Sequence, residues 1–322
     1  MVLPQEDGGG SGSDGSVNPP PGDKPCDALS PRAGVNEVFV GPTGLLARIV
    51  GAIDGAQTSL DVSMYIADQA SILSALSKAA GRGVVVRMVL DGDRSENEGT
   101  FSSLKAAGVD IRTPQGTFEH YHVKTVIIDG QSAIVFSGNF NDYTMSTERN
   151  HGMVVTDPFD VADLESVFEA DFAGGTVPTC TRLVVSPTNS RDRIEALLTG
   201  ATNELLLQEL SISDSSIRTL LANRAKGGLT IRVILANPAW ISANTNTASI
   251  LRAAGVEVRF LKTLDNHAKL IVADGARAYV GSHNLSWTSL EKNREVGVVT
   301  VDQASVTTLK AAFDADWAVS VE

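Results

Sequence analysis

An internal repeat is the sequence feature that most constrains the fold of this chain. The segment VFVGPTGLLARIVGAIDGAQTSLDVSMY at 38–65 resembles LVVSPTNSRDRIEALLTGATNELLLQEL at 183–210, with Pro42 aligned on Pro187, 145 residues later. The same offset carries GVVVRMVL at 83–90 onto GLTIRVIL at 228–235. A repeat of this length predicts two copies of one fold, with equivalent sites in each. We therefore expect one domain over 35–175 and a second over 176–322, after a leader at 1–34.

The fold class follows from the pattern inside each copy. Short apolar runs alternate with segments of helical period, which is typical of buried strands covered by crossover helices. The runs VKTVIID and SAIVFSG are joined at Asp129 and Gly130, a strong signal for a two-residue hairpin turn. The class is therefore α/β with a mixed sheet in each copy. In the first copy we expect strands near 36–40, 58–65, 84–90, 108–112, 123–128, 133–137 and 152–156, and helices near 44–55, 69–80, 99–106 and 158–172.

The leader and the two cysteines carry information about the cellular compartment of the protein. Residues 1–34 are rich in Gly, Ser, Pro and Asp with few apolar side chains, so we expect a flexible segment. A tail of this kind often follows an export signal, which favours a secreted or periplasmic protein. Cys26 and Cys180 each precede the first strand of a copy, so a disulfide is one expectation and two unrelated thiols are the other.

Composition excludes some classes of function. No apolar run approaches the roughly 18 residues that span a bilayer. The formal charge is −12, from 38 acidic and 26 basic residues, which disfavours a protein that binds nucleic acid mainly through its overall field. The two cysteines lack the spacing of a zinc site.

Two equivalent blocks contain the candidate catalytic residues. One reads HVKTVIID at 122–129 and the other HAKLIVAD at 267–274, and they are followed by SGN at 137–139 and SHN at 282–284. Residues two apart on a strand share a face, so His122 and Lys124 point together, as do His267 and Lys269. If these edges face each other, the cleft between them gathers imidazoles, ammonium groups, amides and hydroxyls. That combination predicts a phosphate site.

The residue types indicate a particular reaction. Displacement at a phosphodiester requires a nucleophile, an acid for the leaving alkoxide and positive charge for the remaining oxygens. One neutral imidazole can attack phosphorus and form a phosphohistidine, while a protonated one serves the leaving group. Lysine and asparagine side chains supply the donors, so we expect neither a metal nor a cofactor.

These blocks resemble the phospholipase D superfamily over about 36–320, in its tandem form with two motifs in one chain. The resemblance implies two domains packed with pseudo-twofold symmetry around one active site, and a monomer, because single-motif relatives must dimerise. It implies that His122 and His267 are the catalytic pair, with the N-terminal histidine as nucleophile. The phosphate contacts that it implies come from Lys124, Lys269, Asn139 and Asn284, with support from Ser137 and Ser282. Asp129 and Asp274 lie away from the chemistry by strand parity and are expected to hold local structure.

The sequence departs from the family pattern at the carboxylate that orients the catalytic histidine. Glu295 lies 28 residues after His267 and fits that role for His267. The corresponding stretch of the first copy reads TERNHGMVV, where Glu148 is the nearest acid. We therefore expect a better supported His267, which leaves the choice of nucleophile open.

Three functions remain for such a site. The leading one is a phosphodiesterase that hydrolyses or transfers phospholipid headgroups, with transient contact to a membrane surface. A metal-independent endonuclease and a noncatalytic phosphate-binding protein are the alternatives. Aromatic residues expected near the mouth are Phe118, Tyr121, Phe140, Tyr143, Trp240 and Trp287. Basic residues that a nucleic-acid track would use are Arg94, Lys105, Arg112, Arg149, Lys262 and Arg294.

Overall fold

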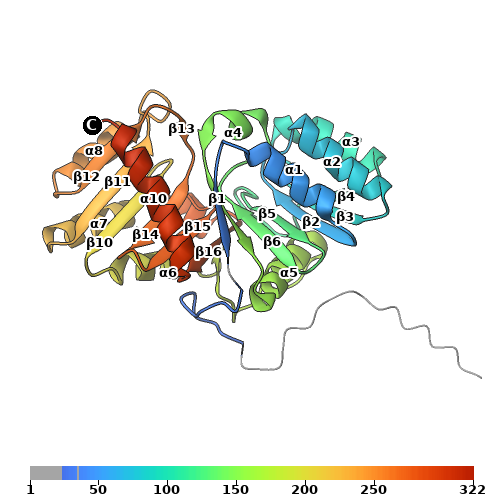
Figure 1. The fold of residues 1–322 in the computed structure, drawn as a ribbon, viewed down its shortest axis with the longest axis horizontal. Coiled ribbons are helices and arrows are strands. Elements are labelled where there is room, and N and C mark those ends of the chain that lie inside the picture. The colour runs from blue at the N-terminus through green and yellow to red at the C-terminus, as the bar shows by residue number, and fades with distance from the viewer. Residues whose placement is uncertain (1–23, 35) are drawn as a thin grey trace, which may run out of the picture.

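The computed structural model describes residues 24–34 and 36–322, and residues 1–23 of the expected flexible leader lie outside this part. Each copy of the repeat forms its own sheet with helices around it (Figure 1). The first copy contains β1 (Glu37–Val40), α1 (Leu45–Gly55), β2 (Ser59–Met64), α2 (Ala70–Gly81), β3 (Val85–Leu90), η1 (Ser95–Asn97), α3 (Glu98–Ala106), β4 (Asp110–Arg112), β5 (Lys124–Ile128), β6 (Ser132–Phe136), α4 (Asp142–Ser146), β7 (Glu148–Arg149), β8 (His151–Val155) and α5 (Pro158–Ala173).

The second copy repeats this order of elements except for η1 and the two-residue strands β7 and β13. It contains β9 (Leu183–Ser186), α6 (Ser190–Thr199), β10 (Glu204–Glu209), α7 (Ser215–Lys226), β11 (Thr230–Ala236), α8 (Asn244–Arg252), β12 (Glu257–Leu261), β13 (Asp265–Asn266), β14 (Lys269–Ala273), β15 (Arg277–Gly281), α9 (Trp287–Glu291), β16 (Glu295–Thr300) and α10 (Gln303–Val319).

The two sheets have the same topology. Each has seven strands, in the order β1-β8-β6-β5-β2-β3-β4 in the first copy and β9-β16-β15-β14-β10-β11-β12 in the second. The β2-β3-β4 and β10-β11-β12 pairings are parallel and the remaining pairings within the sheets are antiparallel. The predicted α/β class with one mixed sheet per copy is therefore confirmed.

The predicted hairpin is present between β5 and β6. Asp129 and Gly130 both have positive φ, 54° and 62°, but three residues, 129–131, separate the paired Ile128 and Ser132, so the loop is one residue longer than the predicted two-residue turn. The Asp129 carboxylate also accepts hydrogen bonds from the backbone N–H groups of Gln57, Thr58 and Ser59. Asp274 accepts the same set of bonds in the second copy. Both aspartates thus tie the hairpin turn to the start of the neighbouring strand.

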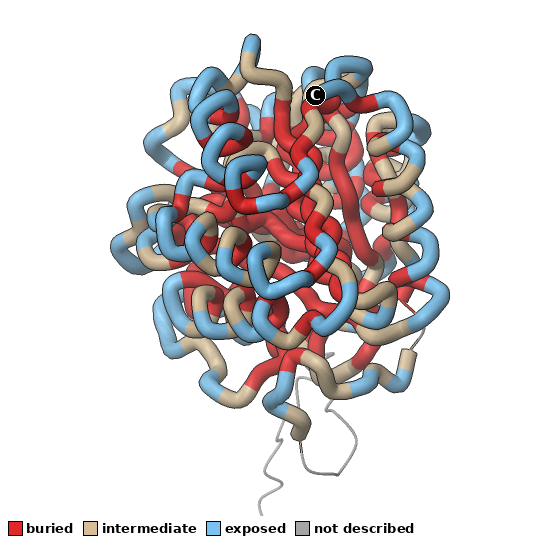
Figure 2. Tube along the Cα trace, turned by 90° about the vertical axis from the view of Figure 1, so that its left-hand side faces the viewer, coloured by how far each residue is buried: buried red, intermediate tan, exposed pale blue. Residues whose placement is uncertain are grey.

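Three groups of buried side chains hold the molecule together. One group lies under α1, α2 and α3 in the first copy, and another under α6, α7 and α8 in the second. The third joins the copies, because α5 and α10 contribute to it together with strands of both sheets. The buried backbone accordingly runs through the middle of the molecule, with exposed segments outside (Figure 2). The domain interface is therefore an apolar core, which favours a fixed relation between the two halves.

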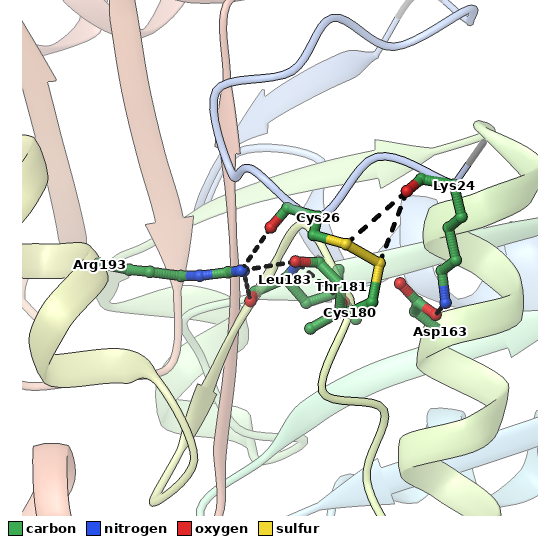
Figure 3. Close-up of a disulfide and its surroundings, with 7 residues drawn as sticks. All are labelled: Lys24, Cys26, Asp163, Cys180, Thr181, Leu183 and Arg193. Carbon is green, nitrogen blue, oxygen red and sulfur yellow. Dashed lines mark hydrogen bonds and ion pairs between the residues drawn. A yellow bond between two sulfur atoms is a disulfide. The ribbon is translucent and has the colours of Figure 1, made fainter.

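The end of the expected leader is more structured than the sequence suggests. Residues 24–34 lie against both copies: Arg32 pairs with Asp160 of α5 and donates to the carbonyl oxygen of Val299 in β16. Cys26 and Cys180 form a disulfide, which confirms that expectation (Figure 3). The prediction of a flexible leader is therefore wrong for 24–34, because buried ion pairs and a covalent link compensate for the absence of apolar side chains. A cross-link over 154 residues is worth about 5 kcal/mol in the chain-entropy treatment.

Candidate active site

The two His-x-Lys pairs lie where the two sheets meet. Lys124 and Lys269 are the first residues of β5 and β14, and each histidine precedes its strand by two residues. The backbone N–H of His122 donates to the carbonyl oxygen of Arg294 at 2.9 Å, and that of His267 donates to the carbonyl oxygen of Arg149 at 3.0 Å. Each histidine is therefore held at its backbone by the opposite copy.

The imidazole rings are also held across the interface. Nδ1 of His122 lies 2.7 Å from Oε2 of Glu295, which belongs to the second copy. Nδ1 of His267 lies 3.2 Å from Oε2 of Glu148 in the first copy, and also 3.2 Å from Oδ1 of Asn150. The prediction that Glu295 supports His267 is therefore wrong: Glu295 supports His122. The sequence offset could not show this, because it compares positions within a copy and the contacts run between copies.

Glu148 was not identified as a site residue because its order relative to asparagine is inverted. The 145-residue offset places Glu148 on Asn293 and Asn150 on Glu295. Each copy thus has one glutamate and one asparagine two residues apart, and the asparagine amide donates to the glutamate of its own copy. A hydroxyl also donates to each glutamate, from Thr144 or Ser289. The inverted pair EXN and NXE was the signal in the sequence that could have found Glu148.

The electrostatics of these pairs follow from burial and charge. Burial lowers the pKa of His122 to about 3 and that of His267 to about 4, against the opposing effect of the nearby carboxylates. Burial raises the pKa of Glu295 and Glu148, but the histidine contacts outweigh it and bring both values to about 2. At neutral pH these values correspond to neutral imidazoles beside ionised carboxylates.

The two lysines are fully buried and lie beside the histidines. Nζ of Lys124 donates to the carbonyl oxygen of His122 at 2.9 Å, and Nζ of Lys269 donates to that of His267 at 2.8 Å. Lys269 also reaches the carbonyl oxygen of Ser137 in the other copy at 3.4 Å. Burial lowers the pKa of both ammonium groups, to about 8 for Lys269. Such groups gain from an anionic ligand, because it restores the favourable environment that burial removed.

The asparagines and serines differ in their availability. Oδ1 of Asn139 and Oδ1 of Asn284 are buried and have no hydrogen-bond partner among the described residues. The serine hydroxyls are engaged: Oγ of Ser137 donates to Asn150 and accepts from the N–H of His151, and Oγ of Ser282 bonds to both backbone groups of Val296. These hydroxyls thus hold residues in or beside the orienting segments, and the expected support of phosphate by Ser137 and Ser282 stays a prediction.

The aromatic residues expected at the mouth differ in exposure. Tyr121 and Phe140 are buried in the core, Phe118 is partly buried against it, and Tyr143, Trp240 and Trp287 are exposed. The ring of Trp240 lies 6.4 Å from that of His267 and 6.2 Å from that of Tyr143, which belongs to the other copy. An exposed aromatic rim, defined as Tyr143 and Trp240, therefore lies near the site, and Trp287 is exposed at the start of α9.

All four arginines considered for a nucleic-acid track have an acidic partner. The pairs are Arg94 with Glu96, Arg112 with Asp110, Arg149 with Asp316 and Arg294 with Asp171. Their charges are therefore largely compensated inside the protein. In the described part of the chain, no group of three or more His, Cys, Asp or Glu is arranged to hold a metal ion, and no helix has the length and apolar character needed to cross a membrane.

Comparison with solved structures supports the architecture. Phosphatidylserine synthase from Haemophilus influenzae Rd KW20 superposes with a TM-score of 0.72 at 11% identity, covering 91% of this chain and 88% of that one. Polyphosphate kinase from Porphyromonas gingivalis superposes with a TM-score of 0.70 at 17% identity over 87% of this chain. The match covers 46% of the kinase, so this chain spans about half its length. At these identities the likeness concerns the fold alone.

Sequence comparison identifies the family. Cardiolipin synthase from Clostridium perfringens (strain SM101 / Type A) is 25% identical over 333 residues, covering 87% of this chain and 70% of that protein. Mitochondrial cardiolipin hydrolase from Chlamydomonas reinhardtii is 26% identical over 129 residues, covering 40% of this chain and 57% of that protein. A family model described as "Cardiolipin synthase, PLD-like domain" matches twice, at 49–172 and 194–317. With both copies matched over most of its length, the chain belongs to the phospholipase D superfamily, in the cardiolipin synthase family of PLD-like domains.

Proposed function

We propose that this protein is a phosphodiesterase of the phospholipase D type that transfers or hydrolyses phospholipid headgroups through a phosphohistidine, without a metal. One observation carries the proposal: each of two imidazoles is fixed through Nδ1 by a carboxylate of the opposite copy. Among the described residues, no hydrogen bond engages Nε2 of either ring. Both reactive nitrogens are therefore available beside two buried ammonium groups.

The proposed first step begins at His122. Its neutral Nε2 attacks phosphorus, the phosphorus–nitrogen bond forms and the bond to the headgroup oxygen breaks. The leaving oxygen takes a proton from Nε2 of His267, which must be protonated at that moment. The negative charge of a bound phosphate favours this state, because it raises the low pKa that His267 has in the empty site. Ammonium groups of Lys124 and Lys269 and the amides of Asn139 and Asn284 donate to the remaining phosphate oxygens.

The proposed second step returns the protein to its starting state. His267, now neutral, removes a proton from water or from an alcohol, whose oxygen attacks phosphorus. The phosphorus–nitrogen bond breaks and its electron pair returns to Nε2 of His122. Water gives hydrolysis and an alcohol gives headgroup transfer, so one site serves both reactions. The synthase names of relatives found by sequence support transfer as the main outcome.

A phospholipid substrate is supported over nucleic acid by two features. The arginines near the interface are paired with acids, and the net charge is −12. The exposed aromatic rim offers apolar surface beside an isolated cationic centre, which suits a lipid better than a polyanion. The names of the relatives also refer to phospholipids.

We also propose a cellular compartment and an oligomeric state for the enzyme. The disulfide between Cys26 and Cys180 is typical of an oxidising compartment, so we place the protein in the periplasm or outside the cell. Because both His-x-Lys motifs are in one chain, we infer a monomer that needs no second copy to complete its site.

The substrate is tested by offering both chemical classes. We expect vesicles of phosphatidylglycerol and phosphatidylethanolamine to be consumed, with transferred product increasing when glycerol is added. Single-stranded and double-stranded DNA should remain intact, and excess EDTA should leave the lipid rate unchanged. The double variant His122→Asn/His267→Asn is the inactive control. Cleavage of DNA with intact lipid would favour the endonuclease, whereas no turnover of any diester would favour the noncatalytic protein.

Transient contact of the aromatic rim with lipid has a direct optical test. The chain has three tryptophans: Trp240 lies in the rim, Trp287 is exposed at the start of α9, and Trp317 stacks on Phe313 in α10. We expect vesicles containing dibrominated phosphatidylcholine to quench the fluorescence of Trp240 and Trp287, because tryptophan settles at lipid–water interfaces. Trp317→Phe should keep most of the quenching and Trp240→Phe/Trp287→Phe should remove it. The reverse pattern would move the contact away from the site.

A further inference from the structure

Two buried arginine–aspartate pairs cross the domain interface in matching positions. Arg149 of the first copy holds Asp316 of α10 through Nε and Nη2, at 2.7 and 2.9 Å. Arg294 of the second copy holds Asp171 of α5 through Nε and Nη2, both at 3.0 Å. The arginines and the aspartates are each 145 residues apart, so the two pairs are equivalent under the repeat.

The third contact of each arginine side chain is also equivalent. Nη1 of Arg149 donates to the carbonyl oxygen of Gly41 at the end of β1, and Nη1 of Arg294 donates to that of Ser186 in β9. Each guanidinium therefore connects the first strand of its own copy to the last helix of the other. A planar group with donors in fixed directions is well suited to set such an orientation.

The backbone of each arginine contacts one histidine of the site. The carbonyl oxygen of Arg149 accepts the N–H of His267, and the residues on either side, Glu148 and Asn150, contact Nδ1 of that same histidine. The carbonyl oxygen of Arg294 accepts the N–H of His122, and Glu295, the next residue, contacts Nδ1 of His122. One short stretch thus fixes both the backbone and the ring of one histidine.

We propose that Arg149 with Asp316 positions His267, and that Arg294 with Asp171 positions His122, each pair acting on one histidine. These four are positioning residues, since they act through the stretches 148–150 and 293–295. The kinetic part of this proposal rests on the proposed function. It adds that each of the two histidines, which have different roles in the reaction, is oriented by its own arginine–aspartate pair. The positioning itself is a property of the folded protein with or without turnover.

The test records the histidine rings directly. Protein labelled with ¹⁵N-histidine has five ring systems, whose long-range ¹H–¹⁵N signals are assigned with the variants His122→Asn and His267→Asn. We expect Asp171→Asn to move the ring signals of His122 and leave those of His267, and Asp316→Asn to do the opposite. Each variant should lower kcat by about 10- to 100-fold with little change in KM, because a small displacement of a reacting group is sufficient for such a loss.

A matched control separates positioning from general destabilisation. Asp61 is also buried and pairs with Arg87 at 2.7 Å, and Arg87 lies over Phe168 and Phe172 of α5, the helix that carries Asp171. Asp61→Asn should lower the melting temperature without moving either histidine signal. If Asp171→Asn and Asp316→Asn move both histidines alike, or neither, the pairs only join the domains and the proposal is overturned.

The spectra also keep the proposal testable apart from the enzymatic function. If the wild-type protein has no turnover, selective movement of His122 and His267 would still support the positioning roles. If a variant unfolds, Arg294→Lys and Arg149→Lys provide gentler changes, since lysine retains the charge but loses the fork of donors. Selective signal movement should then persist with a smaller loss of stability. Its absence in the folded lysine variants would overturn the proposal.

Discussion

Replacing either histidine of the site with asparagine should abolish steady-state turnover, but the two variants should stop at different steps. His122→Asn removes the attacking nitrogen, so we expect kcat on bis-p-nitrophenyl phosphate to fall by at least about 10⁴-fold. His267→Asn leaves the nucleophile in place. Because p-nitrophenolate leaves without a proton, the first step should continue and the second should stall for lack of a base.

The difference between these variants identifies the nucleophile. His267→Asn should release one equivalent of p-nitrophenol rapidly and then accumulate an acid-labile, base-stable phosphoryl group on His122, which peptide mapping after quenching would locate. His122→Asn should show neither the burst nor the adduct. His120→Asn serves as control, because this residue lies in the same loop and has no role in the proposed mechanism. An adduct on His267 would reverse the assignment, and wild-type rates in either variant would refute the shared site.

The sequence predicts the longer strands and helices closely because local hydrophobic patterns determine them. The expected strands near 58–65 and 84–90 became β2 at Ser59–Met64 and β3 at Val85–Leu90, and the helix near 158–172 became α5 at Pro158–Ala173. Buried runs bounded by glycine and proline mark their own ends. The five-residue helices α4 and α9 and the two-residue strands β7 and β13 were not foreseen, because they are too short to show a period.

The composition of the site was predictable, whereas its connections were not. The offset of the repeat places His122 and His267 in equivalent positions, and strand alternation places each lysine beside its histidine. The crossing of Glu148 to His267 and of Glu295 to His122 depends on how two sheets pack, about which neither periodicity nor spacing carries information. The same holds for residues 24–34, whose contacts are made by arginine and cystine rather than by an apolar pattern.

The inverted Glu/Asn order has a consequence for the roles of the two histidines. His122 has one charged partner at 2.7 Å, and His267 shares its Nδ1 between a carboxylate and an amide oxygen, both at 3.2 Å. A close carboxylate stabilises the positive charge that develops on an attacking imidazole. At His267 the carboxylate is farther away and shares Nδ1 with an amide oxygen, so the orientation of this ring depends less on a single partner. The closer carboxylate at His122 is the observation that favours this ring as nucleophile in the proposed mechanism, and the assignment stays a prediction.

Replacing the two glutamates should therefore have unequal and crossed effects. Glu295→Gln keeps an acceptor near Nδ1 of His122 but removes its charge, and we expect the rate of phosphoenzyme formation to fall by roughly 10³-fold, comparable with loss of the orienting carboxylate in other histidine-based sites. Glu148→Gln should have a smaller effect and lower kcat on phospholipid by about 10- to 100-fold, because Asn150 remains on Nδ1 of His267. Rapid-quench measurement of phosphoenzyme formation and decay separates the two steps.

Replacing Glu148 should also change the pH dependence of kcat, in a direction that follows from the charge that is removed. Removing a negative charge disfavours the imidazolium, so Glu148→Gln lowers the pKa of His267 below its value of about 4 in the empty site and correspondingly in the complex. His267 must be protonated to serve a natural alkoxide, so the alkaline limb of kcat on phospholipid should shift to lower pH, while the effect on formation of the adduct from bis-p-nitrophenyl phosphate stays small. Thr144→Val, which removes the hydroxyl that donates to Glu148 and accepts the backbone N–H of Asn139, keeps the carboxylate charge and should shift the limb less. The opposite pattern, in which Glu148→Gln slows adduct formation and Glu295→Gln shifts the limb, would mean that His267 attacks phosphorus and His122 serves the leaving group, since the contacts of each carboxylate with its histidine are fixed by the domain interface.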